Sequence, residues 1–250
     1  SEMCIRDRCI VDQGIDIDKV AKRIVSGKFV NCGQTCIAPD YIVVNNHVKD
    51  ELISMLKKNI ISTFGSTPIK SDSYGRIINT NNLLRLKENL INQNIEFGGK
   101  IDEKNLYVEP TLVIDPDVNS EIMKEEIFGP ILPILSYENE NDLEKILDAN
   151  PSPLAFYIFS KNQKFIDKLI NSNKFGGCVV NDTLIHFVNS NLPFGGIGPS
   201  GMGAYRGKFS FDTFTHYKPV LEKKSMIDLP LRYGPYPSSF NFIKKILEKI

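Results

Sequence analysis

Apolar positions along this chain recur with two spacings, which alternate between helical and extended segments. From residue 17 to about 29 they lie three and four positions apart, behind Asp16, a residue suited to cap a helix. Residues 41–45 then form an apolar run typical of a buried strand, and residues 47–61 return to helical spacing. This alternation predicts an α/β domain with a largely parallel sheet flanked by helices.

The same alternation continues through the rest of the chain. It predicts helices at 83–91, 142–149 and 162–170, and strands at 95–97, 106–114, 131–135, 154–159 and 177–181. Pro110 lies inside one predicted strand, which places it at an edge or a bulge because proline has no N–H to donate. An alternating segment at 215–221 predicts a further strand.

Composition narrows the class of function. The 250 residues carry 30 Lys and Arg against 30 Asp and Glu, without the basic clusters and interleaved aromatics of a nucleic-acid-binding protein. The five cysteines show no CxxC spacing, so neither a disulfide framework nor a metal site is predicted. No apolar run reaches the ~18 residues of a membrane span, and the N-terminus lacks a signal-peptide layout. We expect a cytoplasmic protein that acts on a small molecule.

Cys36 is the candidate nucleophile. It ends the turn GQTC at 33–36, between a helical segment and the strand at 41–45. A thiol with an ordinary pKa of about 8.5 is only a few per cent thiolate at neutral pH, yet it is well suited to attack a carbonyl carbon. Taken alone, a cysteine in a globular chain is more often a small buried apolar side chain.

The flanking sequence favours the reactive interpretation. The stretch GKFVNCGQTCIAPDY at 27–41 resembles the cysteine signature of the aldehyde dehydrogenase superfamily, and APDY is similar to its class 3 or fatty-aldehyde branch. The resemblance implies that Cys36 forms a thiohemiacetal with an aldehyde, while Cys32 is a bystander.

A second phrase, EEIFGP at 125–130, resembles another signature of the same family. By itself, a pair of glutamates before an apolar residue is more often a solvated helix end. The resemblance implies that Glu126 binds the ribose hydroxyls beside the nicotinamide of NAD or NADP, and that Phe128 packs near the nicotinamide ring. A carboxylate suits a diol because it offers two acceptor oxygens to two donors.

The glycine-rich stretch PFGGIGPSGMG at 193–203 contains the spelling GxGxxG of a dinucleotide-binding loop. That motif needs a strand directly before it and a helix at its third glycine, whereas Pro193 precedes this one and Pro199 removes an N–H donor. We therefore expect a loop whose glycines allow backbones to approach closely. With residues 204–212 it resembles the class 3 pattern, which implies a place beside the active site and a part for Phe209 or Phe211 in the aldehyde pocket.

The resemblance divides the chain into four parts. Residues 1–8 fit no family pattern and are set apart as a non-family segment, 9–214 form the catalytic domain, 215–225 the oligomerisation strand of a homodimer, and 226–250 a tail with an amphipathic helix. The basic face of that helix predicts either peripheral membrane contact or cover for a subunit groove. Glu2 has the family's spacing for the general base but lacks the glycines that follow it, so we interpret the match as a coincidence.

These features predict NAD(P)-dependent oxidation of a medium- or long-chain aliphatic or aromatic aldehyde to a carboxylic acid. They also predict a partial chain that is inactive alone, because no strand–glycine–helix unit for the adenine and pyrophosphate is found. One alternative is a non-catalytic dimerisation or scaffold module. Another is acyl transfer to coenzyme A, against which the motifs APDY and FSFD argue.

Overall fold

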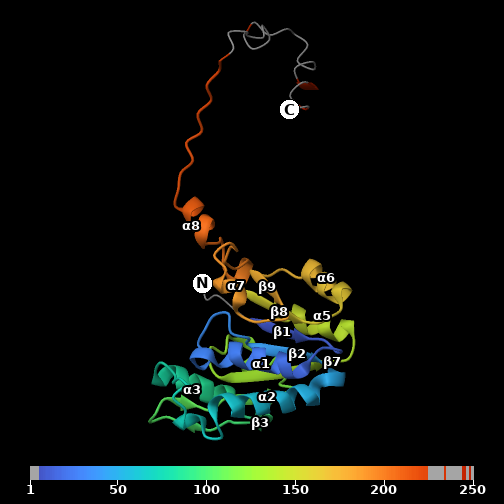
Figure 1. Cartoon of the computed structure of the whole chain (residues 1–250), viewed down its shortest axis with the longest axis vertical. Coiled ribbons are helices and arrows are strands. Elements are labelled where there is room, and N and C mark those ends of the chain that lie inside the picture. Colours follow the sequence, from blue (N-terminus) through green and yellow to red (C-terminus); the bar gives the residue numbers. More distant parts are fainter. Residues whose placement is uncertain (1–5, 225–233, 235–243, 246–247, 249–250) are drawn as a thin grey trace. The chain divides into compact units, whose positions relative to one another are not determined.

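The computed structural model describes residues 6–224, 234, 244–245 and 248. The chain divides into two compact units, Ser1–Phe214 and Thr215–Ile250. In the first unit, seven strands form one sheet in the order β3-β6-β7-β2-β1-β8-β9 (Figure 1). Every neighbouring pair is parallel except β3 with β6. The predicted α/β class with a largely parallel sheet is confirmed.

Most predicted elements are present, with shifted ends. The strands of the main sheet are β1 (Arg8–Val11), β2 (Tyr41–Asn45), β3 (Ile95–Phe97), β6 (Thr111–Ile114), β7 (Ile131–Tyr137), β8 (Ala155–Phe159) and β9 (Gly177–Val180). A separate antiparallel pair consists of β4 (Ile101–Asp102) and β5 (Tyr107–Val108). The helices are α1 (Ile17–Phe29), α2 (Lys49–Phe64), α3 (Thr80–Asn89), α4 (Glu121–Lys124), α5 (Glu140–Asp148), α6 (Gln163–Ser172), α7 (Ile185–Val188) and α8 (Gly207–Thr213).

Helix α1 shows how the local sequence specifies an element. The Asp16 side chain accepts a hydrogen bond from the Lys19 N–H at 3.2 Å, which satisfies a donor that the first helical turn leaves free. Val20, Ala21 and Ile24 are buried, as their three- and four-residue spacing predicts.

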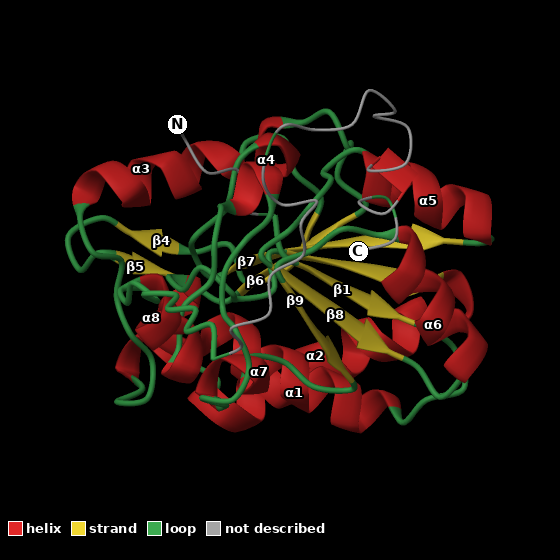
Figure 2. Ribbon diagram, turned by 90° about the horizontal axis from the view of Figure 1, so that it is seen from above, coloured by secondary structure: helices red, strands yellow, loops and turns green. Residues whose placement is uncertain are grey.

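The order of the strands places helices on both faces of the sheet. The step from β1 to β2 runs in one direction along the sheet, whereas the steps from β7 to β8 and from β8 to β9 run in the other. Because such crossovers are right-handed, α1 must cover one face, and α5 and α6 the opposite one. Figure 2 shows α1 and α2 below the strands and α5 above them.

The prediction of a single strand at 106–114 is wrong. β5 ends at Val108 and β6 begins at Thr111, and the two belong to different sheets. Pro110 lies in the break, where its missing N–H leaves no gap in a ladder.

Residues 6–8, which precede the predicted start of the family sequence, are packed in the first unit. Arg6, Asp7 and Arg8 are buried, and the Asp7 carbonyl oxygen accepts a hydrogen bond from the Asp40 N–H at 2.7 Å. Residues 6–8 are therefore built into the first unit, where they lead into the interior strand β1. Glu2 lies outside the described residues.

The two predicted C-terminal elements differ in how much of them the structure describes. Residues 215–224 carry neither helix nor strand, so the strand at 215–221 and its pairing with a second subunit stay predictions. The amphipathic helix predicted in 226–250 falls largely outside the described residues.

Candidate active site

Two loops that are distant in the sequence meet because they lead into neighbouring strands. The cysteine turn at 33–36 precedes β2, and the loop with Glu126 and Phe128 precedes β7. β2 and β7 are adjacent and parallel, with Ile42 opposite Ile134. Both loops therefore lie at the amino ends of the strands, on the same edge of the sheet.

The two loops are in direct contact. Gly33 has a φ of +72°, and a Cβ there would overlap the carbonyl oxygen of Gly129. Glycine is required at this position because only its missing side chain permits both the left-handed backbone and the close approach. Close by, an Asp40 side-chain oxygen accepts a hydrogen bond from the Ile127 N–H at 3.0 Å.

The Gln34 side chain fixes the cysteine turn. Its amide nitrogen donates to the carbonyl oxygens of Asn31 at 3.1 Å and Arg76 at 2.9 Å, and its oxygen accepts from the Ile78 N–H at 2.9 Å. These bonds support a turn in which Asn31 and Cys32 both have left-handed backbone conformations, with φ of 50° and 55°. Such conformations cost free energy in a non-glycine residue and persist when their surroundings fix them.

The second loop is held through its backbone, which leaves its side chains available. Arg85 donates to the carbonyl oxygens of Glu126 at 3.1 Å and Ile127 at 2.7 Å. Ile127 is buried, whereas Glu126 is half-buried and the Phe128 side chain is 36% exposed. Phe128 has a φ of 44°, a conformation that turns the chain sharply before Gly129.

The surroundings of Cys36 shift the pKa of its thiol in both directions. Burial raises the pKa of the Cys36 thiol, and the nearby carboxylates of Asp7 and Glu126 raise it further. The backbone N–H groups of Cys36 and Ile37 act in the opposite direction. The thiol is therefore protonated at neutral pH, and attack on a carbonyl requires a base to remove its proton.

Glu126 lies in a cluster of buried charges beneath the two loops. Burial, reinforced by Asp40, raises the pKa of Glu126 to about 8, while the cations Lys28, Arg6 and Arg85 lower it. Lys28 is itself buried, and burial lowers its pKa to about 8. Lys28 was not predicted from the sequence, where a lysine near a helix end normally indicates solvent exposure.

Glu126 and Phe128 fit the groups that the resemblance assigns to them. The Glu126 carboxyl group accepts no hydrogen bond from any residue that the structure describes, so it is available to a diol. The exposed ring of Phe128 offers an apolar face to a flat ring. No group of three His, Cys, Asp or Glu side chains within the described part of the chain is arranged to hold a metal ion.

Cys36 opens into a hollow of about 470 Å³. Apolar and aromatic side chains and glycine backbone form most of its wall: Leu154, Phe194, Met202, Ala204, Tyr205 and the glycines 195, 196, 201 and 203. Phe209 and Phe211, expected to shape this pocket, are not among its lining residues and are exposed on α8. The hollow suits an apolar substrate group.

The glycine-rich loop is a packing loop, as predicted. A Cβ at Gly195 would overlap the carbonyl oxygen of Gly203, and one at Gly196 would overlap that of Ser200. The helix that follows begins at Gly207 rather than at the third glycine of the motif, Gly201. The arrangement required for a phosphate at a helix N-terminus is therefore not formed there.

His186 lies against Phe194 in the pocket wall. It is 8% exposed, and its ring packs against Tyr157 and Phe194 with centroid distances of 6.0 Å each. Burial lowers the pKa of its imidazole. Its place was not predictable from the sequence, because it depends on α7, a short helix without a clear periodic pattern.

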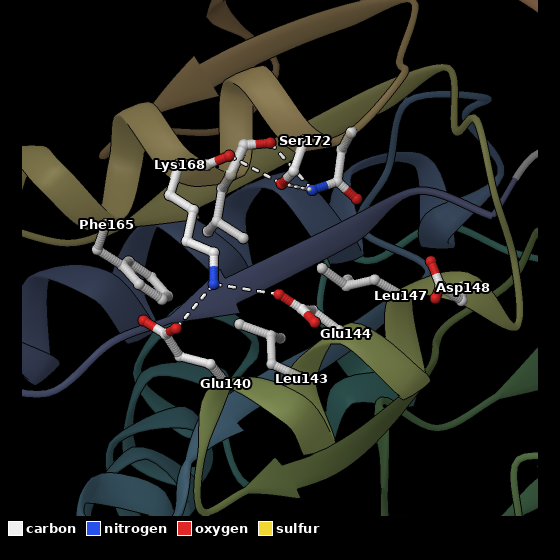
Figure 3. A pocket seen from close by; sticks show the side chains of 10 residues that line it. Glu140, Leu143, Glu144, Leu147, Asp148, Phe165, Lys168 and Ser172 are labelled. Atoms are coloured by element: carbon white, nitrogen blue, oxygen red, sulfur yellow. Dashed lines mark hydrogen bonds and ion pairs between the residues drawn. The ribbon is translucent and has the colours of Figure 1, made fainter.

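A second hollow, of about 150 Å³, lies between α5 and α6 (Figure 3). Lys168 reaches from α6 to Glu140 at 2.7 Å and to Glu144 at 3.1 Å on α5. All three side chains are exposed, so water screens the ion pairs and they contribute little stability. No thiol lines this hollow, and its Lys168 amine is engaged by two carboxylates.

Comparison with known proteins gives a consistent assignment. The aldehyde dehydrogenase family profile matches residues 1–220, including the segment that the sequence had suggested was foreign. The 4,4'-diaponeurosporen-aldehyde dehydrogenase of Staphylococcus aureus is 45% identical over 245 residues, which are 97% of this chain and 53% of that protein. Aldehyde dehydrogenase family 3 member A2 of Rattus norvegicus is 45% identical over 233 residues, 92% of this chain and 48% of that one.

Solved structures agree. The substrate-bound state of Staphylococcus aureus AldH superposes with a TM-score of 0.90 at 44% identity, covering 98% of this chain and 54% of that one. Other similar structures, at 25% identity, include NAD-dependent and NADP-dependent enzymes. The chain thus spans about half the length of the curated relatives it matches. Of the helices described here, none is both long and apolar enough to cross a membrane.

Proposed function

The chain belongs to the aldehyde dehydrogenase family, and on that premise we propose that Cys36 is the nucleophile in an NAD(P)-dependent oxidation of an apolar aldehyde to a carboxylic acid. One observation carries the proposal. The half-buried thiol opens into an apolar pocket, while the loop with Glu126 and Phe128 packs directly against the cysteine turn. A carbonyl group in the pocket and a nicotinamide beside Phe128 would then be neighbours.

The residues of this chain contribute three functions. After a base has taken the thiol proton, the Cys36 sulfur forms a bond to the carbonyl carbon, and the electron pair of the C=O bond moves to the oxygen, giving an oxyanion that the Cys36 backbone N–H stabilises. Glu126 would hold the ribose hydroxyls of the cofactor and Phe128 its nicotinamide ring. The bound cofactor would supply the acceptor for the hydride that leaves the former carbonyl carbon as the oxyanion returns to a carbonyl in a thioester on Cys36. Water then cleaves the thioester, releasing the carboxylate and the thiol.

The substrate is proposed to be a medium- or long-chain aliphatic or an aromatic aldehyde. The support is the lining of the pocket, where Leu154, Phe194 and Met202 offer apolar surface and the glycines offer no side chains. The Staphylococcus aureus relative carries the name of a specific aldehyde, 4,4'-diaponeurosporen-aldehyde, which is consistent with an apolar substrate for a chain 45% identical to it.

We propose that the 250-residue chain alone does not turn over aldehyde. It spans about half of its relatives, and the family resemblance assigns the general base and a second oxyanion donor to sequence outside the matched motifs. Loss of one oxyanion donor costs about 10²–10³ in rate, and loss of a general base costs about 10²–10⁴. We also propose that the chain forms a homodimer through residues 215–221, that it is located in the cytoplasm, and that its tail contacts a membrane.

The test is hydrolysis of a p-nitrophenyl ester by the chain, beside NAD(P)H formation from a medium-chain aldehyde. We expect slow ester hydrolysis that Cys36→Ala abolishes and Cys178→Ala does not change, together with no NAD(P)H. Cys178 is the matched control because it is also half-buried, in β9 rather than in the turn. Ester hydrolysis that persists in Cys36→Ala would favour the scaffold alternative, and NAD(P)H formed by this chain would contradict its predicted inactivity.

A further inference from the structure

A single buried hydroxyl, that of Tyr157, contacts both the nucleophile loop and the loop that starts α7. Tyr157 lies in the middle of β8 and is fully buried. Its hydroxyl donates a hydrogen bond of 2.6 Å to the carbonyl oxygen of Ile37, the residue after Cys36. The bond joins positions 120 residues apart in the sequence, so it exists only because β8 and the cysteine loop meet in the fold.

The position of the Ile37 backbone matters for the sulfur. The backbone N–H groups of Ile37 and of Cys36 itself lower the pKa of the Cys36 thiol. The hydrogen bond from Tyr157 holds the Ile37 carbonyl group and so limits rotation of the Ile37 backbone. The Ile37 N–H is thereby kept directed toward the Cys36 sulfur. Hydrogen bonds to a thiolate favour the charged form. The hydroxyl of Tyr157 therefore acts on the thiol through one intervening residue.

The hydroxyl also interacts with the loop before α7. The backbone N–H of Leu184 lowers the pKa of the Tyr157 hydroxyl, although burial keeps that pKa well above the ordinary value. Leu184 has a left-handed backbone, with φ of 61°, and directly precedes α7. From α7, His186 packs edge-to-face on the Tyr157 ring and against Phe194, which lines the pocket.

Replacement of this hydroxyl would leave two buried backbone groups without their partner. The Ile37 carbonyl and the Leu184 N–H would each need another partner. A buried polar group without a partner costs more free energy than its hydrogen bond contributes. The two loops are then expected to shift apart rather than remain in place.

We propose that Tyr157 is a positioning residue for the Cys36 thiol, because its hydroxyl fixes the nucleophile loop against the α7 side of the pocket. The inference rests on the proposed role of Cys36 and adds a residue to that site. Tyr157 touches neither the sulfur nor a substrate position directly; it acts through Ile37 and Leu184.

The test is the pH dependence of Cys36 alkylation by iodoacetamide in the 250-residue chain, measured by peptide mass mapping. In Tyr157→Phe we expect a higher apparent pKa of Cys36 and alkylation at pH 7.5 that is about three- to tenfold slower, the size of one net hydrogen bond. Asp7 and Glu126, the carboxylates that act on this thiol, are unchanged in the variant.

Tyr74→Phe is the matched control. The Tyr74 hydroxyl is buried and donates 2.8 Å to the Val108 carbonyl oxygen, but it lies beside Cys32 instead of Cys36. This variant should alkylate Cys36 like the wild type. An apparent pKa in Tyr157→Phe at or below the wild-type value would overturn the proposal, and so would an equal effect of Tyr74→Phe, which would indicate general loosening.

A measurement on the wild type covers the case in which Tyr157→Phe does not fold. Hydrogen exchange at the Leu184 amide should be slow, although Leu184 lies in a loop, because its N–H interacts with the buried hydroxyl. Exchange at the rate of an exposed amide would overturn the proposal. The outcomes also separate the two proposals. Ester hydrolysis that does not depend on Cys36 refutes the proposed role of Cys36 as the nucleophile. If hydrolysis depends on Cys36 but Tyr157→Phe leaves the alkylation of Cys36 unchanged, only the role of Tyr157 is refuted.

Discussion

The two ends of the parallel strands differ in how their polar groups are satisfied. At the carboxyl ends, Ser160 donates to Asp12 at 2.6 Å and its N–H bonds to the Asn181 side chain at 3.0 Å. The Asn181 amide returns a bond to the Ser160 carbonyl at 2.9 Å. At the amino ends lie the half-exposed thiol of Cys36 and the Glu126 carboxylate, which has no hydrogen-bond donor among the described residues.

This difference shows that reactive groups, rather than sheet direction, mark the site. Ligands of open α/β sheets normally bind at the carboxyl ends of the strands. Here Asp12, Ser160 and Asn181 at that end are hydrogen-bonded to one another. The amino ends instead carry the Cys36 thiol and the Glu126 carboxyl, which has no hydrogen-bond partner among the described residues. Unused hydrogen-bonding capacity is common at functional sites.

The largest expected effect comes from adding one methyl group at the amino end. Gly33→Ala places a Cβ on the carbonyl oxygen of Gly129 at a φ of +72°, so the two site loops must separate. We expect a loss of about 4 kcal/mol or more in the free energy of unfolding, measured with urea.

Gly14→Ala is the control for this change at the other end of the sheet. Gly14 has a similar φ of +73° with nothing within 4 Å of an added Cβ, so only the backbone strain of about 1–2 kcal/mol applies. Equal losses in the two variants would show that contact between the loops contributes nothing.

An intermediate effect is expected from Glu126→Gln, and it depends on pH. The pKa of Glu126 in the folded chain is about 8, above its ordinary value of 4.5, so between these values the folded state holds a proton that the unfolded state has lost. Wild-type stability attributable to this group therefore falls as the pH rises from 4.5 to 8. Glutamine does not titrate, so the variant does not lose stability in this way. The Tm of the variant minus the Tm of the wild type should therefore rise from pH 5 to pH 9. A constant difference would contradict the buried, unpaired placement of this carboxyl.

The smallest effect is expected from Lys168→Ala, in the hollow between α5 and α6. Its partners Glu140 and Glu144 are exposed, and exposed ion pairs contribute little. Thermal unfolding should change by about 1 °C or less, with Cys36 alkylation unchanged. A slower alkylation would mean that this hollow is coupled to the site at the amino ends.

Much of the fold followed from the sequence because its elements have strong local patterns. The spacing of apolar residues and the cap at Asp16 specify α1, and the run at 41–45 specifies β2. Prediction failed where tertiary structure decides. Residues 106–114 have the pattern of one strand, but they are divided at Pro110 because β5 and β6 belong to different sheets. Helices α7 and α8 are too short for a periodic signal.

The candidate site was only partly predictable for the same reason. Motifs identified Cys36, Glu126 and Phe128 individually, but their proximity depends on the pairing of β2 with β7, which no local pattern specifies. Tyr157 carried no signal, since a tyrosine in an apolar strand is typical of any core. Phe209 and Phe211 were expected in the pocket wall, which is instead formed by residues such as Met202 and Tyr205.

The central claim is that the amino end of the sheet presents Cys36 as a nucleophile toward a carbonyl carbon. Acid quenching of the chain during ester hydrolysis, followed by peptide mass mapping, tests it most directly. The account predicts an acyl group on Cys36 and none on Cys32 or Cys178. An acyl group on another residue, with Cys36 unmodified, would contradict it.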